Sequence, residues 1–357
     1  MKRTILWPML GLATVLLLRA EVAAQSPQPA PAPGPAPAPE ISSKPAAKPK
    51  ARPIARKPAP PPIQPAASAP AAAAPPPAQP DDPNVDLVYG AYQRGFYKTA
   101  FDLATRRAEN GDPKAMTMLG ELNANGMGIR RDDAKAAEWY KRAADSGDRE
   151  AMFELAMLRL AGRGGPVNRE EAAKWLASSA KLGNPKAAYN LALLYLDGQT
   201  LPQDLKRSAE LLRMAADAGS AEAQYALATF YKEGTGVPKD AEQAARLLQA
   251  AALAGNVDAE VEYAIALYNG TGTPKNEAAA VALLRKAARQ NNPIAQNRLA
   301  RVLTNGTPAD RIEALKWHTI AKTAGKGDPE LDEALAKLGP EDRAKAEGAV
   351  RKWFGSK

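Results

Sequence analysis

Cysteine is absent from the 357-residue sequence, and histidine occurs once, as His318. The absence of cysteine excludes disulfide bonds, thiolate nucleophiles and cysteine-based zinc sites. A single histidine leaves no histidine-rich metal site and no Ser–His or Cys–His pair of the kind that nucleophilic hydrolases use. The sequence therefore predicts a protein that is not an enzyme, with no catalytic residue, no bound metal and no cofactor.

Positive charge and proline are both concentrated near the N-terminus. The formal net charge is +9, but most of this excess lies before residue 81, and 21 of the 32 prolines fall between Gln25 and Pro83. The remaining sequence is rich in alanine and leucine and close to neutral. Because nucleic-acid-binding domains carry clustered basic residues on their folded part, we predict no nucleic-acid binding.

The first 24 residues have the three parts of a secretory signal. Lys2 and Arg3 precede an apolar run over residues 5–18, and the small residues Val22 and Ala24 suit cleavage after Ala24. The run is shorter than the roughly 20 residues that a membrane-spanning helix needs. We therefore predict export to the periplasm and no membrane span after cleavage. Retention as an uncleaved anchor is the alternative.

Residues 25–83 consist largely of proline–alanine pairs. Proline removes backbone donors and fixes φ, so this segment is predicted to be a disordered, semi-rigid linker with polyproline II character. A lysine and arginine cluster in its middle could make weak contacts with an anionic polymer or the cell wall. A solvated spacer is the preferred interpretation.

From about residue 112 the sequence repeats every 36 residues. An alanine opens each unit, at Ala115, Ala151, Ala187, Ala223, Ala259 and Ala295. A loop glycine follows, at Gly126, Gly162, Gly198, Gly234, Gly270 and Gly306. Apolar residues spaced by four after the alanine predict a first helix, and the glycine permits the left-handed backbone that ends it. A second helix carrying an alanine pair completes each unit.

Residues that favour helix N-caps stand before the expected helices in the same phase. Before the first helices these are Asp112, Asp148, Asn184, Ser220, Asn256 and Asn292. Before the second helices they are Asp132, Asn168, Asp204, Asp240 and Asn276. Each cap contributes about 1 kcal/mol, so the set predicts the helix boundaries independently of the apolar columns.

These columns resemble the Sel1-like repeat, a relative of the tetratricopeptide repeat. The first unit matches best, through Ala115, Leu119, Gly120, Gly126, Gly128, Asp132, Ala136, Trp139, Tyr140, Ala143, Ala144 and Gly147. The resemblance implies an all-α fold, a right-handed superhelical α-α solenoid whose stacked repeats share one core. It also implies protein-binding, adaptor or regulatory roles, and it fixes no chemistry.

The predicted organisation has five parts. A signal peptide (1–24) and a basic Pro/Ala-rich linker (25–83) precede a degenerate N-terminal repeat (84–111). Six Sel1-like repeats follow over residues 112–327, and closing helices end the chain (328–357). The six repeats are expected at 112–147, 148–183, 184–219, 220–255, 256–291 and 292–327. The last is two residues short in its loop.

The concave face of the solenoid is the predicted partner-binding site. His318 occupies the column of Tyr140 and is predicted to be structural. If the first helices line the concave face, as in tetratricopeptide relatives, apolar and polar side chains form a groove for a peptide. The candidates are Phe153, Met157, Leu160, Tyr189, Leu193, Leu196, Tyr225, Lys232 and Tyr268. Packing between neighbouring first helices is the alternative role, and both can hold.

We therefore predict a periplasmic scaffold, adaptor or regulator that binds an unidentified protein, such as a membrane sensor or an envelope enzyme. One alternative is a structural protein associated with the cell wall through its linker. Another is a hydrolase of envelope glycans or β-lactams, as has been proposed for cysteine-rich relatives. This chain lacks the cysteine pairs of those relatives, which weakens the case that it shares their proposed activity.

Overall fold

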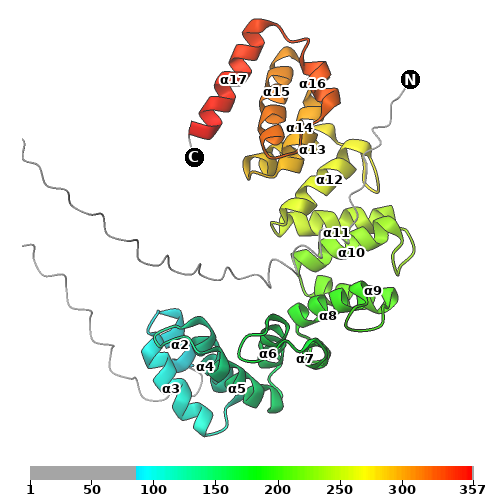
Figure 1. The fold of residues 1–357 in the computed structure, drawn as a ribbon. Coiled ribbons are helices and arrows are strands. Elements are labelled where there is room, and N and C mark those ends of the chain that lie inside the picture. Colours follow the sequence, from blue (N-terminus) through cyan, green and yellow to red (C-terminus); the bar gives the residue numbers. More distant parts are fainter. Residues whose placement is uncertain (1–85, 356–357) are drawn as a thin grey trace, which may run out of the picture. The chain divides into compact units, whose positions relative to one another are not determined.

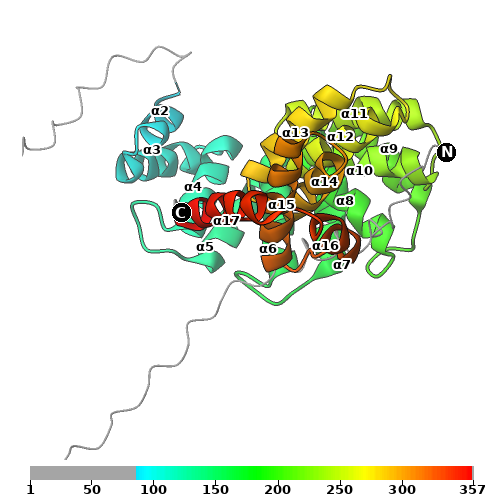
Figure 2. The same ribbon diagram turned by 90° about the horizontal axis from the view of Figure 1, so that it is seen from above.

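The computed structural model describes residues 86–355. The predicted signal peptide and linker lie outside these residues. Within the described range the chain forms sixteen α-helices and no strand, which confirms the all-α prediction. Figures 1 and 2 show these helices as antiparallel pairs that follow one another in chain order.

The helix bounds follow the predicted two-helix pattern. The first helices of the six repeats are α4 (Pro113–Asn125), α6 (Arg149–Ala161), α8 (Pro185–Asp197), α10 (Ala221–Glu233), α12 (Val257–Asn269) and α14 (Pro293–Leu303). The second helices are α5 (Asp133–Asp145), α7 (Arg169–Lys181), α9 (Leu205–Asp217), α11 (Ala241–Leu253), α13 (Glu277–Arg289) and α15 (Pro308–Thr323). Before them come α2 (Leu87–Gln93) and α3 (Tyr97–Glu109), and after them α16 (Pro329–Leu335) and α17 (Pro340–Gly355).

The core is continuous from repeat to repeat because, from α2 to α16, each helix packs on the next one along the chain. The opening alanine of every repeat is at most 3 % exposed, and the small size of this residue lets the paired helices approach closely. Leucines four residues later, such as Leu119 and Leu155, are fully buried between the helices. A single repeat could not cover this apolar surface alone, so neighbouring repeats stabilise each other.

All eleven predicted N-caps are confirmed. In each, the side-chain oxygen accepts a hydrogen bond from a backbone N–H in the first turn of its helix. Such bonds satisfy donors that would otherwise lack a partner at the helix start. The caps therefore fix where each helix begins.

The last repeat differs from the prediction at Gly306. The other five loop glycines, such as Gly126 and Gly270, adopt positive φ at the end of their helix, whereas Gly306 does not. Helix α14 already ends at Leu303, and Thr307 forms a capping box with Asp310 that starts α15 early. The shortened loop therefore needs no left-handed residue at this column.

A charged pair links the first two repeats. Arg163, in the loop after α6, donates to Asp133 Oδ1 at 2.7 Å and to the Ala124 carbonyl at 3.0 Å. The hydrogen bonds from Arg163, aided by Arg131, lower the pKa of Asp133 to about 2. Because the folded state binds this proton less tightly than the unfolded state does, ionised Asp133 stabilises the fold above its unfolded pKa.

We expect Asp133→Asn to lower the free energy of unfolding by about 1 kcal/mol at pH 7, after allowance for solvent screening. The difference from the parent protein should shrink as the pH falls from about 4 through 2, since the parent carboxylate then becomes protonated as well. Urea unfolding at several pH values measures this. Asp145→Asn, which removes an exposed pair with Lys141 inside one helix, is the control and should change little. A difference independent of pH would contradict the assignment.

Candidate protein-binding face

All nine predicted partner-binding residues lie on first helices. Helix α6 carries Phe153, Met157 and Leu160, α8 carries Tyr189, Leu193 and Leu196, α10 carries Tyr225 and Lys232, and α12 carries Tyr268. The first helices of the first two repeats, α4 and α6, are in direct contact. We call the outward side of these helices the first-helix face.

The apolar candidates on α6 and α8 serve both the core and the surface. Phe153 is only 8 % exposed and belongs to the core itself. The other five are half-buried and pack against the same core cluster; these are Met157, Leu160, Tyr189, Leu193 and Leu196. Phe153 therefore offers little surface to a partner, while its neighbours offer apolar surface held in place by packing.

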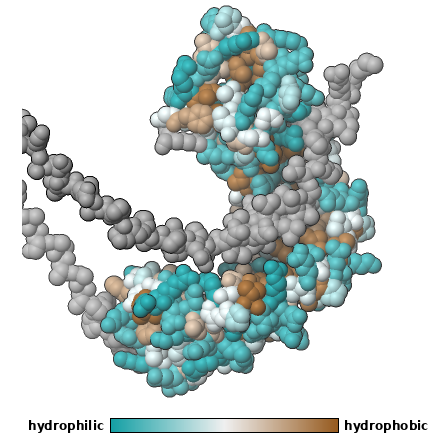
Figure 3. Space-filling view, viewed as in Figure 1, coloured by the Kyte–Doolittle hydropathy of each residue, from teal (hydrophilic) through white to brown (hydrophobic). Residues whose placement is uncertain are grey.

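The candidates on α10 and α12 are more separated. Tyr225 is half-buried against the cluster around Leu248, and Tyr268 against the cluster around Leu284. Between them Lys232 is exposed, and its Nζ donates to Glu262 Oε2 at 2.7 Å. The apolar surface on α6 and α8 thus gives way to a charged pair on α10 and α12. On the side drawn in Figure 3, apolar patches alternate with hydrophilic surface.

Charged residues at both ends of the first-helix face were not among the candidates. Burial raises the pKa of Glu154 on α6; Lys186 opposes this shift, and Glu121 on α4 adds to it. On α14, burial lowers the pKa of Arg298, and the charge of Arg301 lowers it further. The sequence could have indicated these charged residues, because they stand at fixed positions of the repeat, three or six residues after the repeat alanine.

Ion pairs largely neutralise the positive charge at the α14 end of the first-helix face. Arg301 forms ion pairs with Asp328 at 2.5 Å and with Glu330 at 3.2 Å, which join α14 to the start of α16. At the other end Glu121 accepts a hydrogen bond from the Tyr92 hydroxyl. The α4–α6 end of the first-helix face therefore carries the carboxyl groups of Glu121 and Glu154, and the α14 end does not keep a free positive charge.

His318 has a structural environment. It is 2 % exposed in α15, and its Nε2 lies 2.8 Å from Asp332 Oδ1 on α16. Lys322 donates to the same carboxylate, and both partners hold the pKa of Asp332 below its usual value. The contact attaches α16 to α15. Among residues 86–355 no three potential metal-binding side chains come together.

A family model described as the Sel1 repeat matches six consecutive segments, at residues 113–148, 149–184, 185–220, 221–256, 257–292 and 293–326. The chain belongs to the Sel1 repeat family. The matched Sel1 segments begin one residue later than the repeat boundaries predicted from the sequence. Sel1 repeat proteins generally act as scaffolds for protein–protein interactions.

Solved Sel1 structures share the fold. A Sel1 repeat protein from Oxalobacter formigenes is 26 % identical, with a TM-score of 0.59 over 66 % of this chain and 98 % of that chain. A protective antigen of uropathogenic Escherichia coli strains, which displays an SLR fold, is 25 % identical with a TM-score of 0.51. That match covers 72 % of this chain and 64 % of the antigen. No curated protein matches the chain.

In the part of the chain that the structure describes, no helix combines the length and the apolar character that crossing a bilayer requires.

Proposed function

We propose that this Sel1 repeat protein is an exported scaffold or regulator that binds a partner protein of the cell envelope on its first-helix face. The observation that carries this proposal is the row of half-buried side chains on α6 and α8, which present apolar surface beside polar groups. The signal-like N-terminus of the sequence supports export.

Half-buried side chains suit this role physically. Tyr189, Leu193 and Leu196 are already ordered by the core cluster, so a partner that covers them incurs little loss of side-chain entropy. Tyrosine adds a rigid apolar ring with a polar end, and such residues often dominate interface energies. A peptide in an extended or helical form would cover this surface from α6 to α10.

The charges beside the row would orient the partner. The carboxyl groups of Glu121 and Glu154 act on each other at the α4–α6 end, so a basic partner residue would be favoured beside them. Lys232 and Glu262 already pair with each other, so they add polar contacts at the rim with little net charge. The proposed partner segment is therefore apolar, with a basic residue toward α4.

The proposal predicts that Tyr189→Ala combined with Tyr225→Ala weakens binding of the partner at least tenfold. The partner would first be identified by crosslinking in cells, and its affinity for the purified variants measured by calorimetry. Leu253→Ala removes a side chain that is 83 % exposed at the end of α11 and should leave the affinity unchanged. Equal affinities for the double tyrosine variant and the parent would rule out this face.

A further inference from the structure

The third repeat departs from the others in the loop between its two helices. In each of the first five repeats this loop has seven residues and begins with a glycine. The third loop residue is also a glycine in four of them, at Gly128, Gly164, Gly236 and Gly272. In the third repeat this position is Thr200.

The four glycines have a steric reason. All adopt positive φ, and each loop rests on the start of the second helix of the preceding unit. A Cβ at Gly164 would collide with the carbonyl of Asp133, the first residue of α5, and a Cβ at Gly236 with that of Leu205, the first residue of α9. A side chain at this position therefore prevents the loop from seating on that helix.

Thr200 faces the equivalent place on α7, whose first residue is Arg169. Its φ is not positive, and the loop takes another path. In the other four loops the second residue donates its backbone N–H to the preceding helix, as Thr235 does to the Phe230 carbonyl at 3.0 Å. The Gln199 N–H instead donates to Asp197 Oδ1 at 2.8 Å.

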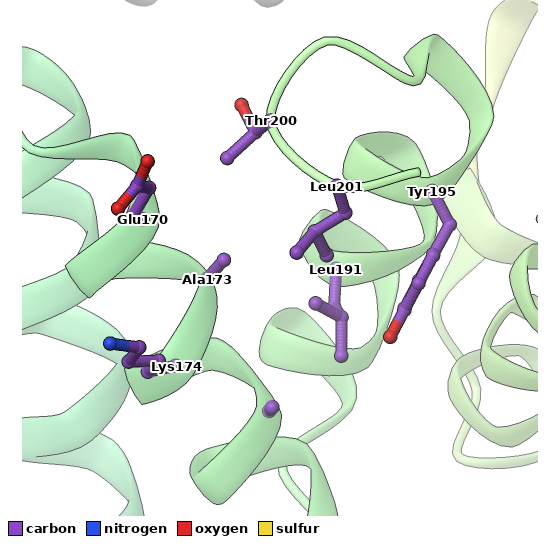
Figure 4. A pocket seen from close by; sticks show the side chains of 8 residues that line it. Glu170, Ala173, Lys174, Leu191, Tyr195, Thr200 and Leu201 are labelled. Atoms are coloured by element: carbon purple, nitrogen blue, oxygen red, sulfur yellow. The ribbon is translucent and has the colours of Figure 1, made fainter. Parts of the chain in front are cut away.

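A pocket lies between α7 and this loop, where the loop does not pack against the start of α7. Its volume is about 360 Å³, at the lower end of the range for small-ligand sites, about 300–1,000 Å³. We call it the loop pocket; its lining residues are Glu170, Ala173, Lys174, Ala177, Leu191, Tyr195, Thr200 and Leu201. Figure 4 shows Glu170, Ala173 and Lys174 on one side, Leu191 and Leu201 on the other, and Thr200 between the two sides.

The lining combines an apolar floor with two opposite charges. Leucine and alanine side chains form the floor. Glu170 and Lys174 stand one turn apart on α7, and both are exposed. Their i,i+4 spacing makes them neighbours on the helix surface, and both line the pocket. Their charged ends point away from the gap in Figure 4, and nothing described holds them there, so they can turn toward a ligand.

We propose that the loop pocket binds a short apolar peptide with free ends, the amino group facing Glu170 and the carboxylate facing Lys174. Residues one turn apart on a helix have Cβ atoms about 5–6 Å apart. In an extended dipeptide the two charged ends are about 6 Å apart, because the Cα atoms are about 3.8 Å apart and each end adds one bond.

The binding of leucyl-leucine to the full chain tests the proposal, by calorimetry and ligand-observed NMR. We expect leucyl-leucine to bind at least tenfold more tightly than N-acetyl-leucyl-leucinamide, in which both charges are blocked. Lys174→Ala should abolish the preference for leucyl-leucine over its amide. Glu170→Ala should abolish the preference over the N-acetyl form. Both residues are exposed, so these variants should fold normally.

Thr200→Gly tests the origin of the pocket, because it restores the residue of the other loops. It should let the loop seat on α7 and reduce leucyl-leucine binding at least tenfold. Thr271→Gly makes the same change at an exposed position of the fifth loop and should leave binding unchanged. No detectable binding of leucyl-leucine, equal binding of the blocked peptide, or undiminished binding by Thr200→Gly would each overturn the proposal. It does not depend on the partner proposed for the first-helix face.

Discussion

Trp317→Ala should lower the free energy of unfolding by about 4 kcal/mol, in the middle of the range for loss of a large buried aromatic. The Trp317 side chain is 2 % exposed and meets the Trp353 ring edge to face, with centroids 5.2 Å apart. Its Nε1 donates to Glu313 Oε1 at 3.1 Å, and Lys316 Nζ lies 4.1 Å from the ring centroid. The substitution removes all of these contacts and leaves a cavity.

The effect should be largest at the C-terminal end. Helix α17 packs on α15, and Trp353 lies on α17, so loss of the Trp317 ring should release this helix. Hydrogen exchange should show lost protection in α17 before other helices, and urea unfolding followed by circular dichroism gives the free energy. Trp139→Ala, in the matching column of the first repeat, removes a half-buried ring and should cost clearly less. Equal losses from both variants would contradict this account of the cap.

The fold was predictable because its determinants are local and repeated. An N-cap such as Asp148 acts on the N–H of Ala151, three residues away, so the sequence shows both partners together. Because the unit occurs six times, the same N-cap pattern recurs in five further repeats. Buried alanines in one column then identify the side of each helix that packs against its partner.

What could not be predicted depends on contacts between repeats. The exposure of Tyr189 is set by how closely α6, α8 and α10 approach one another, and no single column encodes that distance. The burial that raises the pKa of Glu154 has the same origin. The sequence did carry the signal for the loop pocket, since Thr200 breaks a glycine column. The effect of Thr200 could be inferred only from the structure, because it depends on where the second helix of the preceding repeat lies. The four glycines avoid collisions with that helix.

Gly120 shows how one repeat compensates for a larger core residue. The other repeats place alanine in this column, and the residue facing it on the second helix is leucine in four of them, as in the pair Ala156 and Leu176. In the first repeat the facing residue is Tyr140, which is 2 % exposed. A Cβ on Gly120 would lie 2.5 Å from the Tyr140 ring, too close for both to fit.

Gly120→Ala should therefore lower the free energy of unfolding by about 2 kcal/mol, even though alanine favours the helix by about 1 kcal/mol. Adding Tyr140→Leu should restore most of the loss, because the double variant recreates the pair found in four other repeats. Urea unfolding of the parent, both single variants and the double variant forms a cycle whose coupling measures this contact. Additive effects would mean that the Tyr140 ring moves aside without cost. A positive coupling would show that neighbouring columns of this solenoid are chosen in pairs, so that a repeat tolerates a large side chain only where its partner has lost one.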